Sequence, residues 1–172
     1  PYISGHSQRV KQYALMGAKA LSLPWWEIEA IECAGILHDI GKIGIADATL
    51  HKPGPLTTAE WAIVRRHPWI GASIVTGFPS LGEVGKLIAY HHEHYDGTGY
   101  PHGLSGDKIP IGARLLAVAD TFDTLISTRS YQVALSVDEA ILELRKCSGK
   151  QLCPVAVEAF IRGFEKWRQS LA

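Results

Sequence analysis

Apolar residues recur along this chain at spacings of three and four, which is the period of an amphipathic helix. The pattern predicts helices from residue 4 or 5 to about 21, and at 25–37, 81–92, 109–127, 136–146 and 154–169. The capping-box sequence from Thr57 to Glu60 predicts another helix that extends to about Thr76. Pro68 should kink or break that helix near His67. No segment alternates with period two over a useful length, so we expect an all-α fold.

The segments 42–56 and 93–108 are rich in glycine, proline and other turn residues, and we expect both to be ordered loops. The sequence therefore predicts a single helical domain of about seven helices over residues 1–172, with ordered loops around a crevice. The chain does not begin with methionine, which suggests a part of a longer protein.

Composition narrows the choice of partners. Of 172 residues, 47% are hydrophobic and 20% are charged, as in an ordinary globular domain. The 17 basic and 17 acidic residues balance, so no positive field favours a nucleic-acid polymer or an anionic membrane. Charged residues or histidines break every apolar run, so no membrane span is expected in this segment. The three cysteines form no Cys-x-x-Cys motif, and we expect small buried side chains in a reducing, cytoplasmic setting.

Several histidines interrupt an apolar helix or lie near one of its ends, and three of them stand beside a carboxylate or a second imidazole. These positions are His6, His38 with Asp39, His67, and His91 with His92. Imidazole and carboxylate together suit Zn, Fe, Mn, Ni or Co. Each histidine taken alone could instead be a hydrogen-bonded core residue. Adjacent helical residues point about 100° apart, so such pairs serve one cluster only in a crevice between helices.

Asp120 interrupts the most apolar helix. An unpaired carboxylate buried there would cost several kcal/mol, so it needs a cation. Arg114 is almost two turns away, which leaves a metal ion or a distant arginine as the partner. The histidines at 51, 94 and 102 lie in loops and are expected on the solvated surface. The five tryptophans, at 25, 26, 61, 69 and 167, are expected in the core or in a groove wall.

Two longer motifs give a specific resemblance. Residues 38–42 read His-Asp-Ile-Gly-Lys, and His-His-Glu at 91–93 precedes Asp-Gly-Thr-Gly-Tyr-Pro at 96–101. This chain resembles the HD-GYP family, a branch of the HD-domain metal phosphohydrolases, from Gly5 to about Phe160. The resemblance implies the C-terminal, cytoplasmic output domain of a bacterial signalling protein, such as one of a two-component system. It also implies metal-activated hydroxide attack on cyclic di-GMP, giving pGpG, with pGpG or GMP as alternative end products.

The resemblance also assigns residues. It implies a first metal set of four ligands and a second set of three, namely His6, His38, Asp39 and Asp120, then His67, His91 and His92. Asp39 would bridge two divalent ions whose identity is open among Fe, Mn, Ni, Co and Zn. Asp39 and Lys42 would be the catalytic residues, and substrate contacts would come from Lys42, Tyr100 and Arg129. The loop around Tyr100 would also be a contact for a signalling-protein partner.

Three departures from the family pattern keep alternatives open. Residues 129–132 read Arg-Ser-Tyr-Gln, where the family usually ends on arginine or lysine, and residues 152–154 read Leu-Cys-Pro in place of Phe-Asp-Pro. Tyr2 stands where some members have a glutamate ligand, so we expect a binuclear centre, with Asp123 or Glu93 as the alternative source of a third site. The competing functions are hydrolysis of another cyclic dinucleotide or a nucleotide, and a weak or inactive module that binds a cyclic dinucleotide or a protein.

Overall fold

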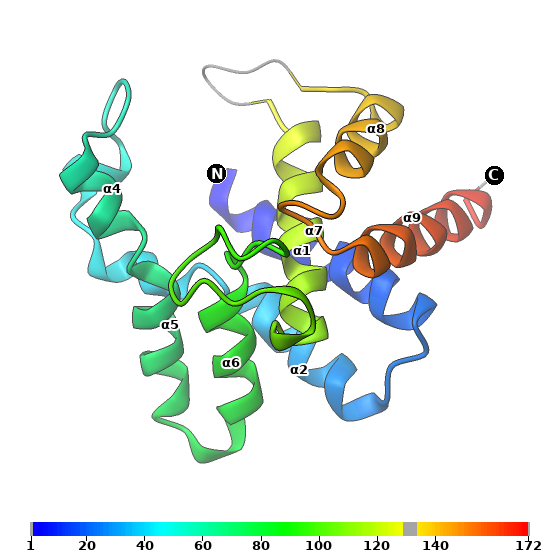
Figure 1. The fold of residues 1–172 in the computed structure, drawn as a ribbon, viewed down its shortest axis with the longest axis horizontal. Helices are drawn as coiled ribbons and strands as arrows, with labels where there is room; N and C mark the ends of the chain where they lie inside the picture. The colour runs from blue at the N-terminus through cyan, green and yellow to red at the C-terminus, as the bar shows by residue number, and fades with distance from the viewer. Residues whose placement is uncertain (1, 129–133, 172) are drawn as a thin grey trace.

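The computed structural model describes residues 2–128 and 134–171, and these residues are helical with no β-strand among them. The α-helices are α1 (Tyr2–Ala20), α2 (Trp25–Leu37), α3 (Asp47–Leu50), α4 (Thr58–Val64), α5 (His67–Thr76), α6 (Gly82–Tyr90), α7 (Ile111–Ile126), α8 (Val137–Cys147) and α9 (Pro154–Gln169). Three short 3-10 helices join them: η1 (Ile40–Gly44), η2 (Pro79–Leu81) and η3 (Gly106–Lys108). Figure 1 shows the order of these elements along the chain.

The all-α prediction is confirmed, and within the described residues seven α-helices have nine residues or more. Two expectations need correction. Helix α1 begins at Tyr2 and not at residue 4 or 5, and the segment 42–56, expected as a loop, contains α3 and most of η1. Such short helices span barely one turn, so they leave no apolar period in the sequence that could predict them.

The helix expected from Thr57 to Thr76 is two helices, α4 and α5. Thr57 caps α4 through a complete capping box with Glu60, as the sequence predicts. The break falls after Val64, and α5 begins at His67 with Pro68 in its first turn, where a proline needs no backbone donor. The break matters because it places His67 at the end of a helix, where its ring can face neighbouring elements.

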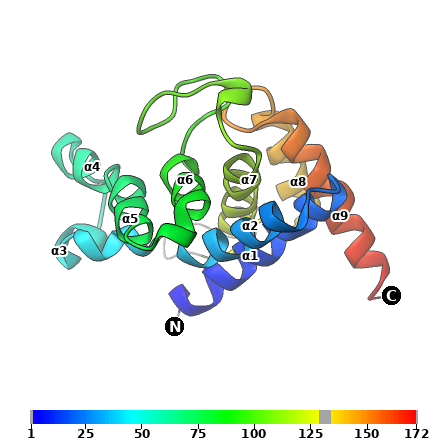
Figure 2. The same cartoon turned by 90° about the horizontal axis from the view of Figure 1, so that it is seen from below.

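The core forms around α1 and α7. Helix α1 packs against α2, α7 and α9, and α5 pairs with α6 (Figure 2). The ring of Tyr13 on α1 makes edge contacts with Phe122 on α7 and with Phe160 and Phe164 on α9. Figure 2 shows the loop between α6 and α7 on the side of the bundle away from the N-terminus.

The tryptophans are not in the core, but Trp26 lines a groove between α2, α6 and α7, so the groove-wall alternative is confirmed for Trp26. All five side chains are between 43% and 71% exposed. Their helical spacing did not reveal this, because helices such as α2 and α5 carry apolar residues on more than one face. The cysteines are free thiols, of which Cys153 is buried and Cys33 and Cys147 are half-buried. Among the described residues, no helix combines the length and the apolar character that crossing a membrane requires.

Candidate metal centre

Six of the seven predicted ligands lie near the ends of helical elements or at their junctions, Asp120 lies within α7, and all seven meet in one place. They come from five elements or their caps: His6 from α1, His38 and Asp39 from the α2–η1 junction, His67 from the start of α5, His91 and His92 from the end of α6, and Asp120 from α7. Helix ends allow neighbouring residues to point into one crevice, which a continuous helix would forbid.

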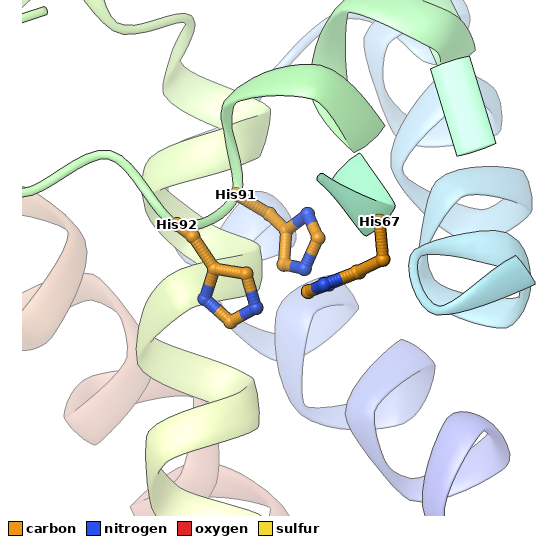
Figure 3. A group of neighbouring side chains, drawn as sticks. All are labelled: His67, His91 and His92. Carbon is orange, nitrogen blue, oxygen red and sulfur yellow. The ribbon is translucent and has the colours of Figure 1, made fainter. Parts of the chain in front are cut away.

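Two groups of potential metal ligands stand out. His67, His91 and His92 each offer one ring nitrogen, and these nitrogens lie within 4.8 Å of one another. Figure 3 shows the three rings pointing toward one another. The second group is His6, His38 and Asp39, whose offered atoms lie within the same 4.8 Å limit. Asp120 joins this second group, because its Oδ1 lies 3.4 Å from Nε2 of His6.

Asp39 stands between the two groups. Its Oδ1 lies 3.5 Å from Nε2 of His67, and its Oδ2 lies 3.7 Å from Nε2 of His38. One carboxylate therefore faces both groups, one oxygen toward each. This is the geometry that a bridging ligand needs.

The backbone sets which nitrogen of each ring faces the centre. Nδ1 of His38 donates to the Gly35 carbonyl at 3.0 Å, and Nδ1 of His67 donates to the Val64 carbonyl at 2.8 Å. Nδ1 of His91 likewise donates to the carbonyl of Ile88 at 2.7 Å. A carbonyl oxygen can only accept, so each Nδ1 carries the proton and each neutral ring presents the lone pair of Nε2 inward.

Those three Nε2 atoms, of His38, His67 and His91, are buried and have no hydrogen-bond partner within the described chain. A buried polar atom without a partner costs about 1–3 kcal/mol, so natural folds rarely leave several together. Lone pairs that converge beside a carboxylate suit a cation that accepts them. The residues present therefore fit a transition-metal centre.

His6 is oriented by a carboxylate. Its Nδ1 donates to Oδ2 of Asp123 at 2.8 Å, and Nε of Arg9 donates to Oδ1 of the same carboxylate at 2.6 Å. Burial alone would raise the pKa of Asp123, but the hydrogen bonds from His6 and Arg9 outweigh it and hold that pKa below its usual range. Asp123, considered above as a ligand for a third ion, is thus engaged in positioning His6.

Glu93, the other alternative ligand, is engaged in the loop that follows. Its buried carboxylate accepts hydrogen bonds from the backbone N–H groups of His102 at 2.7 Å and Leu104 at 3.0 Å. It therefore organises the segment 93–108. In the sequence, this role of Glu93 is indicated only by its position directly after the histidine pair.

The protonation states suit metal binding. Burial lowers the pKa of His91 to about 3, with the nearby His38 and His67 adding to the effect. Burial likewise lowers the pKa of His67 and, more strongly, of His92. Burial would raise the pKa of Asp39, but His38 and Lys42 outweigh it and hold that pKa below its usual range. Neutral imidazoles and an ionised carboxylate are the forms that ligate metals.

Lys42 contacts a candidate ligand directly. Its Nζ donates to Oδ2 of Asp39 at 2.6 Å. Gly41 makes this placement possible, since a Cβ there would overlap the His67 carbonyl and the backbone nitrogen of Gly71. The short η1 helix can therefore lie directly against α5.

An aromatic wall closes one side of the centre. The ring of Tyr100 stacks on His92, with centroids 5.0 Å apart and planes 28° from parallel. Burial raises the pKa of the Tyr100 phenol, so this ring stays neutral. The guanidinium of Arg65 lies over the ring of Tyr100, 5.4 Å from its centroid. Arg65 was not among the site residues predicted from the sequence. Arg129 and Gln132 lie outside the described residues.

A cavity of about 230 Å³ adjoins the candidate metal centre at His91, His92 and Asp120. Its walls are mostly polar and include three ligand candidates: His91, His92, Glu93, His94, Ala117, Asp120, Thr121, Thr124 and Gln151. His94 is therefore half-buried in this wall and not on the solvated surface as expected, while His51 and His102 are exposed.

Comparison with known proteins agrees with this architecture. The sequence model of the HD domain family matches residues 1–153, so the chain belongs to the HD domain family. A solved structure of Bd1817, an HDG"Y"P protein from Bdellovibrio bacteriovorus, superposes with a TM-score of 0.73 at 23% identity, covering 92% of this chain and 51% of that one. The fold is shared, and the predicted HD-type helical domain is confirmed.

Two curated relatives carry functional names. The cyclic di-GMP phosphodiesterase response regulator RpfG of Xanthomonas campestris is 44% identical over 162 residues, which are 93% of this chain and 43% of the relative. The 3'3'-cGAMP-specific phosphodiesterase 2 of Vibrio cholerae is 40% identical over 169 residues, 97% of this chain and 32% of the relative. The chain thus spans less than half the length of these relatives.

Proposed function

We propose that this chain is a metal-dependent phosphodiesterase that hydrolyses cyclic di-GMP to pGpG and further to GMP. The observation that carries the proposal is the set of three buried Nε2 atoms, of His38, His67 and His91, that converge beside Asp39 without hydrogen-bond partners. The names of the relatives support the substrate class, and the HD domain family supports the metal dependence.

The site would hold two divalent transition-metal ions, chosen among Fe, Mn, Ni, Co and Zn. The first would be bound by His6, His38, Asp39 and Asp120, and the second by His67, His91 and His92 with the other oxygen of Asp39. Ions bound there supply a lowered water pKa and neutralise charge on the phosphate. The donor set, nitrogen with carboxylate oxygen, disfavours Mg²⁺ and Ca²⁺.

The remaining residues act on the substrate. Lys42 and Asp39 form a close pair, and the lysine ammonium would place positive charge where the scissile phosphate gains negative charge. Tyr100 lines the site beside His92 and would contact the substrate, as the resemblance implies. Arg129 would contact the other phosphate, as the resemblance implies.

The wider setting is part of the same proposal. Residues 1–172 would form one output domain of a longer cytoplasmic signalling protein, of the kind that two-component systems use. A partner protein would contact the loop that Glu93 holds in place, around Tyr100. A related substrate, 3'3'-cGAMP, is the second candidate, since a relative with 40% identity is specific for it by name.

Hydrolysis assays with the metal-loaded protein test the proposal. Protein loaded with Mn²⁺ or Fe²⁺ is incubated with cyclic di-GMP, 3'3'-cGAMP or cyclic di-AMP, and products are separated by chromatography. We expect pGpG from cyclic di-GMP, loss of activity in His91→Ala, and normal activity in the matched control His51→Ala, whose histidine is exposed in the α3 region. Binding of cyclic di-GMP without turnover under every metal would instead favour the inactive binding module.

A further inference from the structure

Arg65 lies at the mouth of the candidate metal centre. It caps the C-terminal end of α4, two residues before His67, and its side chain is exposed. The guanidinium carbon Cζ lies 5.4 Å from the ring centroid of Tyr100 and 6.0 Å from that of Trp61. Because Tyr100 stacks on His92, one aromatic ring separates this cation from the histidine cluster.

Three other cations near the site have an acidic partner, whereas Arg65 has none among the described residues. Lys42 pairs with Asp39, Arg9 pairs with Asp123, and Lys52 at the base of α4 pairs with Glu60. Within residues 2–128 and 134–171, no carboxylate lies within 4.0 Å of the Arg65 guanidinium. Its positive charge is therefore available to an anion that approaches the centre.

The two aromatic contacts orient the Arg65 guanidinium without using its N–H donors. A cation over a ring interacts through the π face, and the N–H donors of a guanidinium lie in its own plane. Those donors match two oxygens of a phosphate in a bidentate pair. Two rings that hold the guanidinium also reduce the side-chain entropy that binding would otherwise cost.

We propose that Arg65 binds the phosphate of the cyclic dinucleotide that is not being cleaved, in addition to the Arg129 contact proposed above, with Tyr100 and Trp61 holding its guanidinium in place. This inference rests on the proposed function. A cyclic dinucleotide has two phosphodiesters, and the one outside the metal centre must lie at its mouth. Arg65 thereby supplies a second-phosphate cation in a chain that carries the neutral Gln132 where the family usually has a basic residue.

The test compares two substrates. Cyclic di-GMP carries two phosphates, whereas bis(p-nitrophenyl) phosphate carries one. In Arg65→Gln we expect kcat/KM for cyclic di-GMP to fall about 10- to 100-fold, mainly through KM, as for the loss of a charged hydrogen bond. This loss should exceed the loss on bis(p-nitrophenyl) phosphate at least tenfold. Arg65→Lys should recover part of the affinity, and Arg66→Gln, an exposed arginine next to it without a ring contact, is the matched control.

Three results would overturn the inference: equal losses on both substrates, no loss on either, or an Arg65→Lys enzyme as weak as Arg65→Gln. The last would assign Arg65 to the edge of a guanine. Calorimetric titration with cyclic di-GMP separates this from the proposed function. If the parent protein binds cyclic di-GMP but does not cleave it, the proposed hydrolytic function is wrong. The ratio of the Kd values of the parent and Arg65→Gln then still decides whether Arg65 binds the substrate. A parent that neither binds nor cleaves it overturns both.

Discussion

The buried carboxylate of Asp123 accepts a 2.8 Å hydrogen bond from Nδ1 of His6, although 117 positions separate the two residues. The bond leaves Nε2 of the same ring 3.4 Å from Oδ1 of Asp120. Arg9 holds the far side of the Asp123 carboxylate, so the imidazole is fixed from behind. Residues of this kind orient a metal ligand without touching the metal.

Replacing Asp123 by asparagine should weaken metal binding at the His6 side of the centre. The amide keeps the size but loses the charge that fixes the tautomer of His6, and such changes typically cost about 10- to 100-fold in metal affinity. Competition with a chelator, read by elemental analysis, should show one weakened ion. Asp138→Asn, at an exposed position on α8, is the control and should bind as the parent does. An unchanged affinity in Asp123→Asn would remove its positioning role.

Asp39→Ala should lose most of both ions, because one carboxylate faces both ligand groups. Asp120→Ala, which removes a ligand from one group only, should lose one ion and keep the other. Elemental analysis of purified protein gives the ions per chain for each variant. Full occupancy in Asp39→Ala would show that Asp39 does not bridge. Three ions per chain in the parent, seen as three anomalous-scattering peaks, would contradict the binuclear centre.

Lys42→Ala should keep the fold and the metals yet lose turnover by roughly a hundredfold, the usual effect of removing one electrostatic donor. The structure adds a second effect, because the Lys42 charge helps to lower the pKa of Asp39. Without it that pKa rises, so metal release on acidification should begin at a higher pH than in the parent. Lys86→Ala, which removes an exposed lysine of α6, is the control. A parent-like rate in Lys42→Ala would place Lys42 outside the reaction.

The protein treated with a chelator should lose stability as the pH falls. The pKa of His91 is about 3 in the fold against an ordinary value of 6.5, and those of His67 and His92 are also lowered. Between pH 6.5 and about 3 the unfolded chain therefore binds more protons than the folded one. This stability is fully present above pH 6.5 and declines progressively below it. Urea denaturation at pH 7.5, 6.5 and 5.5 measures the decline, which His91→Gln should reduce; equal stability at all three would contradict the prediction.

Cys153→Asp should stabilise the fold. Cys153 is the N-cap of α9 and makes no side-chain capping bond, while its Sγ accepts only a 3.5 Å contact from Nη1 of Arg114. Nε of Arg114 is buried without a partner within the described chain. An aspartate would cap α9 and face the guanidinium, and a cap alone contributes about 1 kcal/mol. Thermal melting should show a higher Tm, with a smaller gain in the neutral control Cys153→Asn; a lower Tm would show that burying the charge costs more.

Local chemistry in the sequence predicted most of the helices. Apolar periods marked α2, α7, α8 and α9 to within two residues, and the capping box at Thr57 marked the start of α4. The break before α5 followed from Pro68 alone. These features depend on residues within a few positions of one another, so a single chain reveals them. The seven ligand candidates were found because they stand in ordered motifs and interrupt apolar helices.

Tertiary structure alone decided which side chains meet. The pairing of His6 with Asp123, the stacking of Arg65 on Tyr100 and the bond from Arg114 to Cys153 join residues 35 to 117 positions apart. It also decided that the tryptophans face outward, because a helix that is apolar on several faces does not specify the buried one. No local period connects such residues. Their contacts arise from how the helices pack, and packing is the sum of many small interactions along the whole chain.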